Sequence, residues 1–183
     1  MSETTTTPPQ GAAQQLPPLV VNIQYVKDLS FEVPNAPAIY TQLRAAPRVD
    51  INLDVQARRV AEGQSAFEVT LHIRAEAFEA PAAAATNGNG NGAAAAASGE
   101  RVFLAELAYA GVFTLTGLPE NTVEPVLLVE CPRILFPFAR NILADVTRDG
   151  GFPPVLLQPI DFVSLWQQRR AQQAAAETPA ATA

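Results

Sequence analysis

Apolar and polar side chains alternate with a period of two in three separate stretches of this 183-residue chain. The stretches cover residues 21–33, 49–56 and 67–74, and a fourth, less regular apolar stretch runs from Arg101 to Phe113. A period of two points successive side chains to opposite faces of an extended strand. The pattern therefore predicts four strands of an antiparallel sheet that is buried on one face and solvated on the other.

Breaks in the alternation mark the ends and irregularities of these strands. The first stretch is interrupted at Val26 and Lys27 and ends at Pro34 and Pro37, because proline cannot donate to a sheet ladder. Residues 58–64, which contain a Glu-Gly pair, are typical of a hairpin connection. We expect the odd-numbered apolar residues of the first strand to share its buried face.

After residue 114 the apolar spacing becomes helical. We expect a helix that begins or kinks at Pro137 and ends at Asp149 to Gly151. An extended crossover over residues 152–159 precedes a last helix over residues 162–176, which Asp161 can cap. The first helix carries an apolar stripe of residues four apart, with a second set alongside it: Ile134, Phe138, Ile142 and Val146, then Leu135, Ala139 and Leu143.

The composition divides the chain into one domain and three low-complexity segments. Residues 1–17 and 177–183 lack the large apolar side chains that ordering requires, and we expect them to be disordered tails. Residues 80–99 are uncharged, with an Asn-Gly repeat between alanine tracts, and predict a flexible insert rather than a short alanine helix. The domain then covers residues 18–176.

The charge of the chain excludes several classes of partner. Charged residues make up 16% of the sequence, the net charge is −6, and Lys27 is the single lysine. A basic face for nucleic acid or for an anionic membrane surface is therefore not expected. The N-terminal residues lack the pattern of a signal peptide, and no apolar run reaches the length of a membrane span, so we expect a cytoplasmic protein.

An enzyme function for this chain would depend on its one thiol and its one imidazole. Cys131 and His72 could form a nucleophile and base, but each is explained by its place in a helix entrance or on an alternating strand. The sequence contains none of the common hydrolase, metalloprotease or dithiol motifs, and one histidine does not supply a metal site. We therefore predict no enzyme activity, cofactor or metal, with a small Cys/His enzyme as the alternative.

Two surfaces could contact other molecules. Asp28 and Glu32 share the polar face of the first strand, and Glu106 lies on the fourth, so that face is either simply solvated or an acidic docking surface. One sheet and two helices also leave apolar side chains uncovered, which favours an oligomer interface or a binding groove. A purely structural oligomer is a further alternative.

Several segments resemble the SecB family of protein-export chaperones. The matching runs are residues 22–37, 103–113 and 131–140, with short ones at 151–154 and 159–162. The resemblance implies a four-stranded antiparallel sheet followed by two helices, an α+β fold. It further implies a homotetramer built as a dimer of dimers, which holds unfolded precursor polypeptides without ATP and delivers them to the SecA motor ATPase.

The resemblance also assigns roles to individual residues. The motor-docking positions fall on Asp28, Glu32, Leu104 and Glu106. Large apolar residues near the matching segments are the candidates for the client groove: Ile39, Tyr40, Phe113, Leu115, Phe138 and Trp166. The helix stripe supplies the candidates for the oligomer interface: Ile134, Ile142 and Val146. The insert at 80–99 and the alanine-rich tail depart from the family pattern.

Overall fold

The central element of the computed structural model, which describes residues 17–79 and 99–177, is a four-stranded sheet. The strands are β1 (Leu19–Glu32), β2 (Arg48–Arg59), β3 (Ala66–Phe78) and β4 (Arg101–Leu115). They lie in the order β1-β4-β3-β2, and each neighbouring pair is antiparallel. The four predicted strands are confirmed, and β1 and β2 form the two edges. The predicted tails and nearly all of the insert lie outside the described residues.

The prediction that the odd-numbered residues of β1 share one buried face is wrong. The pairing of β1 with β4 shifts between Val21 and Ile23 and again between Val26 and Asp28. Each bulge adds one unpaired residue and so inverts which side chains face the core. Ile23 and Tyr25 consequently lie on the solvent face, and the sequence break at Val26 and Lys27 is the second bulge.

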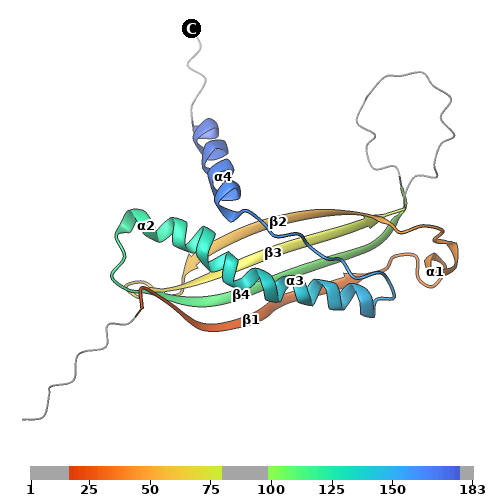
Figure 1. The fold of residues 1–183 in the computed structure, drawn as a ribbon, viewed down its shortest axis with the longest axis horizontal. Helices are drawn as coiled ribbons and strands as arrows, with labels where there is room; N and C mark the ends of the chain where they lie inside the picture. The colour runs from red at the N-terminus through yellow and green to blue at the C-terminus, as the bar shows by residue number, and fades with distance from the viewer. Residues whose placement is uncertain (1–16, 80–98, 178–183) are drawn as a thin grey trace, which may run out of the picture.

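The helical segment after β4 begins much earlier than Pro137. It consists of α2 (Glu120–Pro125), a π-helical turn η1 (Val126–Glu130) and α3 (Cys131–Asp149), and it lies along one face of the sheet (Figure 1). Pro137 stands inside α3 on an exposed side of the helix, and neither a helix start nor a break occurs there. The π turn changes the side-chain spacing between α2 and α3, and for this reason the helical period was not continuous in the sequence.

The end of the chain follows the sequence expectation closely. A crossover without regular structure leads to α4 (Phe162–Glu177), and the Asp161 carboxylate accepts hydrogen bonds from the backbone N–H groups of Val163 and Ser164, at 3.0 and 3.2 Å. Figure 1 shows α4 projecting from the β2 side of the sheet rather than lying across it. A short helix, α1 (Ile39–Gln42), lies in the connection between β1 and β2.

The main core lies between the sheet and α3. Leu71, Phe113, Leu135 and Leu143 are each fully buried in it. Gly111 of β4 lies beneath α3 with no room for a side chain, since a Cβ there would be 2.8 Å from a ring carbon of Phe113 and 2.9 Å from a methyl group of Leu135. Among the described residues no helix is long and apolar enough to cross a membrane.

Candidate functional site

The face of the sheet turned away from α3 carries polar side chains in rows across the strands. We call it the open face. Because of the two bulges in β1, Asp28 and Glu32 point to the same side as Glu106. Three adjacent rows, each written from β1 outward, contain the predicted docking residues: Glu32–Leu104–Glu76, Ser30–Glu106–Arg74–Asn52 and Asp28–Ala108–His72–Asp54. The structure thus brings all four docking candidates together on the open face, with Leu104 largely covered and the carboxylates at the surface.

The carboxylates predicted to dock a partner differ in their surroundings. Arg74 donates to Oε1 of Glu106 and, through its other terminal nitrogen, to Oε1 of Glu76 at 3.1 Å. Arg101 lies 3.1 Å from the same Glu76 oxygen. Asp28 and Glu32, in contrast, make no side-chain hydrogen bond or ion pair with any residue that the structure describes. Their charges are therefore the ones most available to a partner.

A shallow cavity of about 220 Å³ lies between these rows. Its floor is Ala108, whose side chain is too small to fill the space between its neighbours on β1 and β3. Asp28, His72, Arg74 and Glu106 stand around it. The cavity is therefore lined by both signs of charge.

At the other end of the open face, the buried carboxylate of Glu68 is the centre of a hydrogen-bonded cluster. Glu68 of β3 accepts hydrogen bonds from the Arg58 Nε group, the Tyr25 hydroxyl and the Lys27 ammonium group, which is 2.9 Å away. The Arg58 bond has the largest effect and desolvation, which opposes it, the second largest; with the smaller effects of the Tyr25 and Lys27 bonds, the net result lowers the pKa of Glu68 from 4.5 to about 2. The cluster spans β4 and joins β1, β3 and β2. Sequence reasoning had not singled out Glu68.

Along the helix-facing side of β2, the protein leaves apolar surface uncovered. One cavity of about 410 Å³ lies between β2 and the crossover, where Ile51 and Leu156 have 40% and 60% of their surface exposed. Two adjoining cavities of about 260 and 580 Å³ lie between β2, the π turn and α4, and both are lined by Val55, Leu128 and Trp166. We call these three cavities together the β2 trough.

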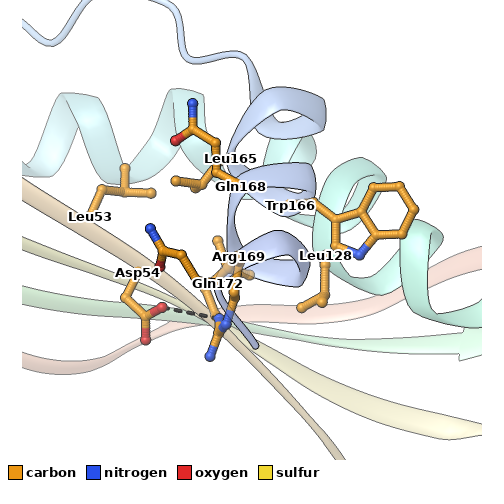
Figure 2. A pocket seen from close by; sticks show the side chains of 9 residues that line it. Leu53, Asp54, Leu128, Leu165, Trp166, Gln168, Arg169 and Gln172 are labelled. Atoms are coloured by element: carbon orange, nitrogen blue, oxygen red, sulfur yellow. Dashed lines mark hydrogen bonds and ion pairs between the residues drawn. The ribbon is translucent and has the colours of Figure 1, made fainter. Parts of the chain in front are cut away.

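Polar contacts hold α4 against the β2 trough (Figure 2). The Arg169 guanidinium donates to Oδ1 of Asp54 at 3.1 Å and to the backbone carbonyl of Val55 on the edge strand. The Trp166 indole N–H donates to Oε1 of Glu124 on α2, at 3.1 Å, and the Arg170 guanidinium lies above the indole ring. Helix α4 is therefore held at its start by Phe162, which is buried in the main core, and farther along by these polar contacts beside a partly open apolar space.

The six predicted groove residues fall into two groups. Ile39 and Phe113 are fully buried and Leu115 is 5% exposed, so in the single chain these three lie within the cores and present almost no surface. Tyr40 and Phe138 are about half exposed, and Trp166 lines the β2 trough. Sequence reasoning missed Ile51 and Leu156. The alternation of β2 and the proline-bounded crossover contained a signal for both, but not for the cavity between them.

The apolar stripe of α3 lies at the border of the core and is only partly covered. Leu135, Ala139 and Leu143 pack on the sheet and are fully buried, whereas Phe138 is 51% exposed. Ile134, Ile142 and Val146, the predicted interface residues, are partly buried at the border of the core. The second set, which the sequence placed beside the stripe, thus faces the core, whereas the predicted stripe leaves apolar surface uncovered.

The Cys131 and His72 pair is not brought together. Cys131 is fully buried in the core beneath α3, where burial, with a smaller contribution from Glu130, raises the pKa of its thiol to about 12. His72 lies on the open face, on the opposite side of the sheet. A thiol that stays protonated and cannot reach its base does not form the nucleophile pair of the enzyme alternative.

Comparison with known proteins identifies the family. Residues 12–173 match the family model described as preprotein translocase subunit SecB. The chain belongs to the SecB family. It is 66% identical over 159 residues to the protein-export protein SecB of Acidiphilium cryptum, an alignment that covers 86% of this chain and 92% of the relative. It is 60% identical over 170 residues to the SecB of Granulibacter bethesdensis, with 93% and 90% covered.

A solved structure agrees with the SecB fold. The SecB-like chaperone of Mycobacterium tuberculosis, in complex with a ChAD peptide from the HigA1 antitoxin, matches with a TM-score of 0.57 over 78% of this chain and 90% of that one. At 15% identity the likeness concerns the fold alone. The predicted family and the α+β fold class are therefore confirmed, and SecB is a family of export chaperones, not of enzymes.

Proposed function

We propose that this SecB-family protein is a cytoplasmic, ATP-independent holdase that keeps unfolded precursors competent for export and delivers them to SecA. The observation that carries the proposal is the β2 trough, an apolar surface beside a strand edge. Burying exposed apolar side chains of an unfolded chain stabilises its complex with the chaperone and draws it away from folding. This mechanism requires no reacting group.

The β2 trough suits clients of many sequences. β2 is an edge strand, so its outer N–H and C=O groups can pair with an extended client backbone. The apolar cavities beside it can take different client side chains without one specific pocket. We propose that Ile51, Leu156 and Trp166 contact the client, with Tyr40 and Phe138 extending the apolar surface.

A pair of exposed apolar residues tests this assignment. Leu156→Asp places a charge in the β2 trough, and Val60→Asp places the same charge on a residue of similar exposure (52%) at the hairpin end of β2, outside the cavities. We expect Leu156→Asp to weaken the delay of client refolding at least about fivefold, because a buried charge opposes apolar contact. Val60→Asp should leave it unchanged. Equal effects of the two variants, or none, would refute the assignment.

We further propose that the apolar stripe of α3 joins copies of the chain into a dimer of dimers. Several weak client sites on one assembly then act together, since a long client bound at one site meets the next at a high effective concentration. Ile142→Lys should dissociate the assembly and weaken client binding in parallel. Asn141→Lys adds the same charge at a neighbouring exposed position and should do neither.

Native mass spectrometry with and without an unfolded polypeptide measures the oligomeric state and client binding in one experiment. A monomeric Ile142→Lys variant that delays refolding as well as the unsubstituted protein would contradict the avidity argument. A tetramer that binds no unfolded chain would instead favour a purely structural oligomer.

The open face is our proposed docking surface for SecA. Asp28, Glu32 and Glu106 lie together there, and a basic segment of the motor would complement them. Reversing Asp28 to Lys should weaken motor binding, and binding by the unsubstituted protein should weaken with salt. Client binding should change little, because the β2 trough lies on the other side of the sheet. A reversal that removed client binding alone would overturn this assignment of surfaces.

A further inference from the structure

The charge pattern of the open face is not uniformly negative. Arg74 of β3 lies in the middle row, directly opposite Glu106 of β4, and its two terminal nitrogens bridge Glu106 and Glu76. Of the three proposed docking carboxylates, Glu106 is therefore already neutralised by a neighbour. Asp28 and Glu32, on β1, have no such partner among the described residues.

We propose that Arg74 is a specificity determinant of the open face: it competes with a partner's cation for Glu106, so that Asp28 and Glu32 contribute more than Glu106 to the recognition of a basic docking segment. This inference rests on the proposed docking of SecA to the same face. A cation of the partner can approach Asp28 and Glu32 directly. At Glu106 it must displace the Arg74 guanidinium, which remains nearby, held by Glu76, and repels it.

Exposure makes this competition possible. The side chains of Arg74 and Glu106 are 43% and 42% exposed, so the pair is in contact with solvent and can exchange partners. Exposed ion pairs of this kind are weak, and displacing one changes an affinity by about two- to fivefold.

The chain offers a matched control on the same face. Arg48 pairs with Asp50 at 2.8 Å, with side-chain exposures of 47% and 53%, and lies at the far end of β2. Arg74→Gln and Arg48→Gln remove the same formal charge from the open face. Only the first releases a proposed docking carboxylate. Arg74→Lys keeps the charge but cannot bridge two carboxylates in the same fork, and it separates net charge from pairing.

Affinity for purified SecA, measured by titration calorimetry at one fixed ionic strength, tests the competition. We expect Arg74→Gln to bind about two- to fivefold more tightly than Arg48→Gln, with Arg74→Lys in between. In a double-mutant cycle, Glu106→Gln should weaken binding more in the Arg74→Gln background than in the unsubstituted one.

The possible outcomes distinguish the competition for Glu106 from the docking of SecA itself. Equal affinities of Arg74→Gln and Arg48→Gln, or an equal effect of Glu106→Gln in both backgrounds, would overturn the competition and leave docking intact. A loss of affinity in Arg74→Gln, with circular dichroism unchanged, would show that Arg74 itself contacts the motor and would also overturn it. Absence of SecA binding by the unsubstituted protein would refute the proposed docking function, and the competition with it.

Discussion

Replacing Glu68 by Gln should destabilise the protein in a way that depends on pH. Glu68 has a side chain only 7% exposed and accepts hydrogen bonds from Arg58, Tyr25 and Lys27. At about 1.36 kcal/mol per pKa unit, lowering its pKa from 4.5 to about 2 corresponds to about 3 kcal/mol of stability at neutral pH. Glutamine keeps the shape but not the charge, so we expect the free energy of unfolding to fall by about 2–3 kcal/mol at pH 7.

The stability that Glu68 contributes depends on pH in a direction set by its lowered pKa. Because the folded-state pKa lies below the ordinary value, the stabilisation is complete above about pH 5 and disappears as the pH falls toward about 2. The difference between the unsubstituted protein and Glu68→Gln should therefore shrink to about half by pH 3. Urea unfolding followed by far-UV circular dichroism, at one protein concentration between pH 3 and 7, measures it.

Asp50→Asn is the matched control for Glu68→Gln. It removes an open-face carboxylate whose partner Arg48 is exposed, and it should change the free energy of unfolding by less than about 1 kcal/mol. A difference for Glu68→Gln that stayed constant from pH 7 to pH 3 would refute the charge-based account. A difference no larger than that of Asp50→Asn would show that the cluster contributes little.

Three further predictions concern packing, the thiol and the insert. Gly111→Ala should lower the free energy of unfolding by about 1–3 kcal/mol, because its methyl group would overlap Phe113 and Leu135; an unchanged urea midpoint would show that α3 has room to shift. Cys131 should resist a thiol reagent in the folded protein, since its thiol is buried with a pKa raised to about 12, and Cys131→Ala should hold clients normally; fast labelling before unfolding would contradict this. Replacing residues 80–98 by a two-residue turn should preserve the fold and the refolding delay, because the Glu79 N–H donates to the Glu100 carbonyl at 3.0 Å and already closes the strand ends; loss of either property would give the insert a role.

The strands could be predicted because a one-sided sheet imposes a period of two on its residues. The second bulge in β1 leaves a break in the alternation at Val26 and Lys27, but the first bulge leaves none, since a single unpaired residue inverts the pattern without a turn signal. Ile23 and Tyr25 were misplaced for this reason, while Asp28 and Glu32 reached the expected face only because the second bulge follows the first.

The helices could be predicted from the sequence only in part. A π turn and three prolines obscured the segment from Glu120 to Pro137, although both ends of α4 were close to their predicted positions. On α3 the sequence displayed two apolar sets, and only the packing shows that Leu135 and Leu143 take the core while Phe138 stays exposed. The β2 trough depends on contacts between β2, the π turn and α4, which no local pattern encodes.

Trp166 makes the position of α4 visible by spectroscopy. It is the single tryptophan of the chain, and its indole is held between Glu124 of α2 and Arg170 of α4, at the wall of the β2 trough. Indole emission depends on the polarity and charge immediately around the ring. The tryptophan fluorescence of the protein therefore reports on the contact between α4 and α2. A change in emission wavelength on adding an unfolded polypeptide would record a change in the environment of α4, even where the sheet stays as it is. Equally, a fluorescence-monitored denaturation curve would follow the environment of this helix, and its comparison with a curve from circular dichroism would show whether α4 and the sheet unfold together.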